Sequence, residues 1–175
     1  FLGLNGFADY LPNLPDGDIT LLNAKAEKYA VFVRRVAMQV FYQIKLQGWN
    51  LLRADDIQQA KDFTVVHAVL SPQGALLGTS IENRSGSARF DETMQSAVQK
   101  GARDPHPPPD GAAADGNFHF IFVARSWAQT SSDPRTGFPG EQRWLLLKTG
   151  LQGGRERNAP PLQPQACSPG IERAH

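Results

Sequence analysis

The sequence is poor in cysteine, has no excess of either charge and contains no long apolar run. Its single cysteine, Cys167, excludes a disulfide within the chain. Lysine and arginine number 18 against 17 acidic residues, and the net charge of +1 argues against nucleic acid as the main partner. No apolar stretch approaches the ~20 residues that a helix needs to cross a bilayer. The remaining composition, 41% hydrophobic and 20% charged over 175 residues, is typical of one globular domain with flanking tails.

The two ends differ in composition from the middle. Residues 1–20 mix glycine and proline with scattered apolar side chains, and we interpret them as an irregular N-terminal arm. Residues 128–175 are rich in glycine and proline, so we expect a largely disordered tail, in which 144–148 could form a short strand or helix. The chain starts at Phe1 rather than methionine, so we expect it to derive from a longer or processed protein.

A long helix is predicted over residues 21–47, because apolar residues recur there at spacings of three and four. The stripe consists of Leu22, Ala26, Tyr29, Val33, Val36, Val40 and Ile44. Gly48 is expected to end the helix. A coiled coil is the alternative, but barely three heptads without ordered flanking charges favour packing on a sheet. Residues 49–61 are open between a helical turn and a plain connection.

A hairpin and a second helix follow. Residues 63–70 are rich in β-branched side chains, 71–74 form a turn with Pro72 at its second position, and 75–82 supply the return strand. A helix is predicted from about residue 89 to 100, with Ser87 as its N-cap and Gly101 at its end.

A third strand is predicted over residues 117–125. Its alternation places Phe118, Phe120 and Phe122 on one face and leaves the polar and β-branched positions on the other. The order helix-strand-strand-helix-strand predicts an α+β domain over residues 21–127. We expect two layers, a three-stranded antiparallel sheet with both helices on one face.

Candidate chemistry is sparse. His67 and His119 could be neighbours on paired strands, with His106 on a nearby loop, but no metal-binding spacing such as HExxH is present. Ser85 lies in no G-x-S-x-G motif, and no glycine-rich phosphate loop occurs. We therefore predict no catalytic residue, no metal site, no cofactor and no enzymatic activity. A small hydrolase remains the alternative if a deep polar pocket is lined by these histidines.

The order of several residues resembles the C-terminal domain family of TonB and TolA. Residues 22–32 resemble the helix that precedes this domain in TonB-related proteins. The further matching features are Ser85-Gly86, Phe90-Asp91, Ala97-Val98 and Pro107-Pro108-Pro109. In the family these correspond to a Ser-Gly turn, a hydrophobic-Asp pair that opens the second helix, an Ala-Val pair near its end and a proline-rich exit into the last strand.

The resemblance implies a periplasmic domain tethered to the inner membrane by a segment absent from this chain. Such a domain couples the proton-motive force to outer-membrane transporters. Its partners would be an outer-membrane TonB-dependent receptor and the inner-membrane proton-channel complex, with no nucleic acid. TonB-type domains recruit an extended receptor segment by strand addition at the last strand. Carried onto this chain, the partner-binding residues would be Asn117, Phe118, His119, Phe120, Ile121, Phe122, Val123, Ala124 and Arg125.

Two other functions share this fold. A TolA-like envelope-integrity protein would bind a different set of partners. A structural envelope module would instead associate with itself into a homodimer, because the open edges of a three-stranded sheet can pair with a second copy.

Overall fold

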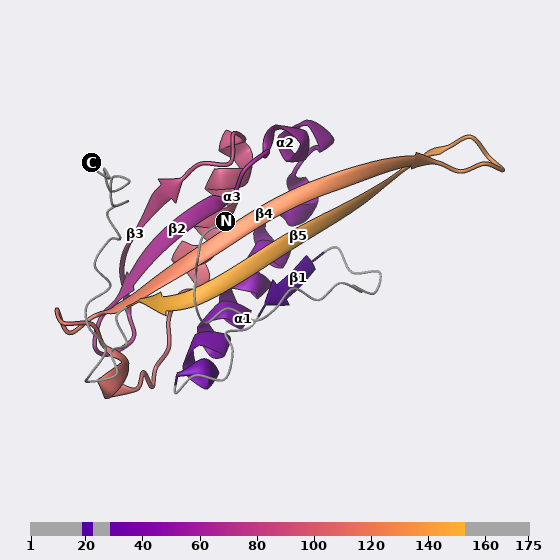
Figure 1. Ribbon diagram of the computed structural model, residues 1–175. Helices are drawn as coiled ribbons and strands as arrows, with labels where there is room; N and C mark the ends of the chain where they lie inside the picture. Colours follow the sequence, from indigo (N-terminus) through magenta and orange to yellow (C-terminus); the bar gives the residue numbers. More distant parts are fainter. Residues whose placement is uncertain (1–18, 23–28, 153–175) are drawn as a thin grey trace, which may run out of the picture.

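The computed structural model describes residues 19–22 and 29–152 and shows an α+β fold, a sheet with its helices on one face (Figure 1). The main helices are α1 (Ala30–Gln47) and α3 (Ala88–Gly101), and the short ones are η1 (Trp49–Leu51), α2 (Ala54–Gln59) and η2 (Pro109–Gly111). The strands are β1 (Ile19–Leu22), β2 (Thr64–Leu70), β3 (Leu76–Asn83), β4 (Phe118–Ser132) and β5 (Pro139–Gln152).

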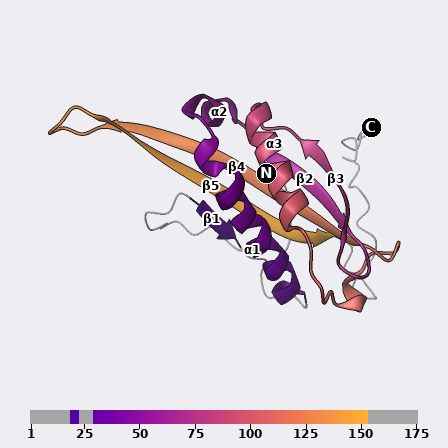
Figure 2. The same ribbon diagram turned by 180° about the vertical axis from the view of Figure 1, so that it is seen from behind.

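The sheet has the order β1-β5-β4-β2-β3. The four strands from β5 to β3 are antiparallel, and the four-residue β1 adds to β5 in parallel. Seen from behind, α1 and α3 lie across the same face of this sheet (Figure 2). The prediction of two helices on one face of an antiparallel sheet is therefore confirmed.

Helix α1 packs through the predicted stripe. Val33, Val36, Val40 and Ile44 are all buried, and the helix ends where Gly48 donates its N–H to the carbonyl of Ile44. The predicted start at residue 21 is wrong, because residues 21 and 22 belong to strand β1. An apolar run beside the open edge of a sheet can satisfy its backbone groups by pairing with that edge, and local periodicity does not reveal this choice. Residues 23–28 lie outside the described residues.

The second helix begins as predicted. The hydroxyl of Ser87 accepts the N–H of Phe90 at 3.2 Å, and α3 ends at Gly101. One turn into the helix, the buried carboxylate of Asp91 accepts the hydroxyl of Thr64 at 2.5 Å and the N–H of Ser85 at 3.0 Å. These bonds join the start of α3 to strand β2 and to the loop after β3, and they satisfy polar groups that burial would otherwise leave unpaired.

The core lies between the helices and strand β4. Phe118, Phe120 and Phe122 are at most 1% exposed, as their alternation predicts. The ring of Phe32 from α1 contacts Phe118 and Phe120 edge-on, at centroid distances of 5.2 and 5.3 Å. Aromatic pairs with this geometry contribute about 0.5–1.5 kcal/mol beyond the area that they bury.

The sheet contains two strands, β1 and β5, beyond the three that the sequence predicts, so the expected count of three strands is wrong. Strand β4 continues past residue 127, and all of β5 pairs with it in antiparallel orientation. In the turn between the two strands, the carbonyl of Asp133 accepts the N–H of Gly137. Leu145 and Leu147 of β5 are buried in the core. Residues 128–132 and 139–152, expected to belong to a disordered tail, thus form part of the sheet, and 153–175 lie outside the described residues.

The limits of the domain differ from the prediction at both ends. At the N-terminal side, residues 19 and 20, assigned to an irregular arm, belong to β1, and 1–18 lie outside the described residues. Residues 49–61, left open from the sequence, contain the short helices η1 and α2. Beyond the other strands, β4 and β5 alone continue as a projecting two-stranded ribbon (Figure 1).

The turn between β2 and β3 requires glycine. Gly74 has φ +82°, and a Cβ atom there would lie 1.6 Å from the carbonyl oxygen of Asp104. That contact is part of the fold, because the N–H of Asp104 donates to the carbonyl of Gly74 at 3.0 Å. Gly116 has a similar φ of +84°, but a Cβ there would meet no atom within 4 Å.

We expect Gly74→Ala to lower the free energy of unfolding by at least about 3 kcal/mol, because backbone strain and a collision with the chain add together. Gly116→Ala carries the strain alone and should cost about 1–2 kcal/mol. Urea unfolding of both variants measures the difference, and equal losses would show that the Gly74–Asp104 contact does not constrain the turn.

Asp91→Ala should lower the free energy of unfolding by about 3 kcal/mol, because it leaves the Ser85 N–H and the Thr64 hydroxyl unpaired inside the protein. The matched control is Glu92→Ala, one residue along on the exposed side of α3, which should change stability by less than about 0.5 kcal/mol. Thermal or urea unfolding distinguishes the two, and similar effects would contradict the role given to Asp91.

Candidate partner-binding edge of the sheet

The strand predicted to receive a partner lies inside the sheet. Residues 118–124 of β4 pair with β2 on one side, and residues 119–132 pair with β5 on the other. The remaining predicted residue, Asn117, precedes the strand, and its carbonyl accepts the N–H of Ala113. The expectation that residues 117–125 form an edge strand is therefore wrong. A partner strand could reach the backbone of residues 119–124 only by displacing β2 or β5.

The side chains of the predicted residues divide between the two faces of the sheet. Phe118, Phe120, Phe122 and Ala124 point into the helix-covered core. On the opposite face, Ile121 and Val123 form a second apolar cluster with Val65 and the adjacent Phe63. The guanidinium of Arg125 lies 5.2 Å from the centre of the Phe63 ring, a cation–π contact on this outer face.

The edges of the sheet are formed by other strands. On one side, β3 pairs with β2 alone. On the other side, β5 pairs with β4 along its whole length, and β1 covers only Leu145–Lys148 of its outer edge. Within residues 19–22 and 29–152, no other strand pairs with the outer backbone of β5 or of β3. Unpaired strand backbone of this kind can bind a further strand.

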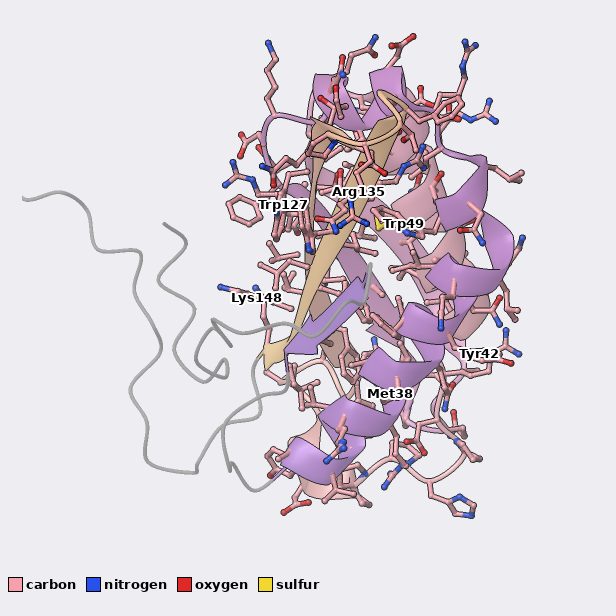
Figure 3. The ribbon with its side chains drawn as sticks, turned by 90° about the vertical axis from the view of Figure 1, so that its right-hand side faces the viewer. Met38, Tyr42, Trp49, Trp127, Arg135 and Lys148 are labelled. Atoms are coloured by element: carbon pink, nitrogen blue, oxygen red, sulfur yellow. The ribbon has the colours of Figure 1, made fainter. Side chains whose placement is uncertain are left out.

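The outer edge of β5 accepts a strand in parallel orientation. Leu145, Leu146, Leu147 and Lys148 face β1 in direct register. Next to this stretch, Trp144 stacks on Trp127 of β4 with ring centres 6.0 Å apart. Figure 3 shows Trp127 and Lys148 on the side of the sheet that faces away from the helices. The edge thus lies beside a large aromatic contact and a lysine on the same outer face.

The two sheet histidines are neighbours, as predicted. His67 Nε2 and His119 Nδ1 lie 2.9 Å apart, and His119 Nε2 lies 2.7 Å from a carboxylate oxygen of Asp115. The N–H of Asn117 and then the ring of His119 lower the pKa of Asp115 below its ordinary value. This chain of hydrogen bonds links β2, β4 and the loop before β4 on the outer face.

The histidines do not assemble a metal centre in the part of the chain that the structure describes, where no three histidine, cysteine or acidic residues are grouped to hold an ion. His106 lies in the loop after α3, where its N–H donates to Asp104. The hollow between α1 and the end of α3 is lined by residues such as Met38, Tyr42 and Arg103, and none of its lining residues is a histidine.

The sequence signals for the edge strand were present but weak. Asp133, Pro134 and Gly137 are turn residues, and the Asp133 carboxylate accepts the N–H of Arg135 at 2.8 Å. The following apolar run is buried on both faces of the sheet at Leu145, Leu146 and Leu147, so it lacks the alternation that marks a half-exposed strand. The turn chemistry was therefore the signal that could have located β5.

Comparison with known proteins identifies the domain. The family model described as "TonB C terminal" matches residues 38–123, from the middle of α1 to the middle of β4. This family is non-catalytic and its domains are periplasmic. No curated protein and no solved structure was found to match the chain. Among the described residues, no helix has both the length and the apolar composition that crossing a membrane requires.

The contacts of Asp115 predict its titration. We expect its carboxyl carbon to titrate below 3.8 in a 13C NMR experiment, and His119→Ala to raise the midpoint only partway, because the larger cause, the Asn117 N–H, remains. A group with a lowered pKa adds stability above its ordinary pKa, and that stability is lost as the pH falls through the folded value. A midpoint at or above 3.8 would contradict the hydrogen bonds described.

Proposed function

Because residues 38–123 form a TonB C-terminal domain, we propose that this chain is the partner-binding part of a TonB-type energy transducer. In this role the domain captures an extended segment of an outer-membrane receptor. A segment outside this chain tethers it to the inner membrane and to the proton-channel complex. The function is associative, so it needs no catalytic group, metal or cofactor.

We place the receptor segment on the outer edge of β5. The observation that carries this placement is the β1–β5 pairing, in which four residues of the chain itself add to that edge in parallel. An edge that binds one short strand presents its backbone groups in the geometry that strand addition needs. In the antiparallel sheet, β5 is also the last strand along the chain, the position at which TonB-type domains bind.

The edge of β5 is longer than the strand that it binds within the chain. Strand β5 spans Pro139–Gln152, whereas β1 covers Leu145–Lys148 only. A receptor segment longer than four residues would gain backbone bonds on either side, at the positions next to Trp144 and Thr149. Such a segment could therefore displace β1, because it makes more hydrogen bonds at the same edge.

Titration of isotopically labelled protein with synthetic peptides from the periplasm-exposed N-terminal segments of receptors tests the proposal. We expect amide shifts along residues 144–150 of β5, together with protection of those amides from hydrogen exchange. A control peptide with proline at alternate positions lacks the donors for pairing and should not bind. Absence of shifts, or shifts confined to β3, would overturn the placement.

A variant that cannot form β1 sharpens this experiment. Thr20→Pro with Leu21→Pro removes the backbone donors of β1 whichever of the two faces β5. We expect the receptor peptide to bind this variant about tenfold or more tightly, because no internal strand competes. Unchanged affinity would show that β1 and the peptide use different edges.

A further inference from the structure

Helix α1 has a second apolar face that the domain core does not use. Val31, Met38, Tyr42 and Leu46 are between 47% and 70% exposed, and they supply four of the seven large apolar side chains exposed in the described part of the chain. Their spacings of seven, four and four place them within roughly 80° on one side of the helix, over a length of about 22 Å. Figure 3 shows Met38 and Tyr42 on α1, on the side of the helix away from the sheet.

A hollow adjoins this face where α1 meets the end of α3. It has a volume of about 680 Å³ and is lined by Met38 and Tyr42 from one helix and by Lys100, Gly101 and Arg103 from the other. The two helices approach closely beside it, because a Cβ atom on Gly101 would lie 2.8 Å from the backbone of Val40. The close contact at Gly101 thus holds the two helices together beside the hollow, which is open to the surface.

Every charged side chain of α1 is positive. The helix contains Arg34, Arg35 and Lys45 and no acidic residue. Arg35 pairs with the buried carboxylate of Asp104 at 2.7 Å, whereas Arg34 and Lys45 are exposed and have no ion-pair partner among the described residues. An apolar stripe flanked by uncompensated positive charge is complementary to an apolar surface flanked by carboxylates.

We propose that the outer face of α1, defined by Val31, Met38, Tyr42 and Leu46, docks an amphipathic helix of another protein whose apolar stripe is flanked by aspartate or glutamate. The helical period of the stripe matches the i, i+4 and i+7 anchors by which helices bind grooves. Exposed apolar side chains concentrated on one element mark interaction sites more often than scattered ones do. This surface lies on the helix side of the sheet, so a partner there leaves the edge of β5 free.

Two other occupants fit these features less well. A second copy packed along α1 would place Arg34 and Lys45 opposite each other in an antiparallel pair, or opposite themselves in a parallel pair, and both arrangements are repulsive. An anionic lipid surface would satisfy the charge but would not fill a hollow between two helices. The acidic helix satisfies both the charge and the shape.

The test uses the whole chain and two designed 18-residue helical peptides with the same leucine stripe, one flanked by glutamate and the other by lysine. We expect the glutamate peptide to bind, with NMR shifts centred on Met38, Tyr42 and Leu46, and the lysine peptide to bind at least about tenfold more weakly. Arg34→Glu with Lys45→Glu should weaken the glutamate peptide about tenfold.

The matched control variant is Lys61→Glu with Arg84→Glu, which makes the same change in net charge at exposed positions outside α1 and should leave the affinity unchanged. Equal binding of the two peptides, or shifts that avoid α1, would overturn the proposal. Concentration-dependent dimerisation through α1, or binding to phosphatidylglycerol vesicles that abolishes peptide binding, would assign the face to a second copy or to a lipid surface instead.

Discussion

The contact between Phe32 of α1 and the phenylalanine row of β4 organises the molecule. Its ring lies against both Phe118 and Phe120, and together with the buried stripe of α1 it positions the helix on the sheet. Strand β4 is also the one strand that pairs with both β2 and β5. Both the position of α1 and the hydrogen bonds of β2 and β5 therefore depend on β4, whose helix-facing side chains are buried in the core.

This central position of β4 decides which parts of the sheet can bind a partner. A strand buried at the centre stabilises the domain but offers no free backbone. Free edge backbone is found instead on β3 at one side of the sheet, and at the other side on β5, outside the stretch that β1 covers. Residues that resemble the family's motif have structural roles here. Asp91 binds Ser85 and Thr64, and a Cβ atom on Gly86 would lie 2.7 Å from the carbonyl oxygen of Gln59. Family resemblance therefore locates the fold more directly than it locates the binding surface.

The two proposed surfaces lie on different elements, which suits the proposed role of connecting partners. One is a backbone edge, where hydrogen bonds supply affinity and tolerate varied side chains. The other is a helix face, where side-chain shape and positive charge select the partner. The packing of α1 on β4 joins them mechanically, since the helix that bears the second surface is held by the strand that pairs with β5.

The sequence by itself determined the elements whose signals are local. The Ser87 cap, the turn at Gly74, the buried stripe of α1 and the alternation of phenylalanines in β4 each arise within a few residues, and each was predictable. Only the tertiary structure decided how far the sheet extends. Residues 144–148 suit a strand or a helix equally well, and they become a strand because β4 offers them an unpaired edge. Pairing between distant segments is a property of the assembled sheet, so the strand that lies at its edge could not be determined from local pattern.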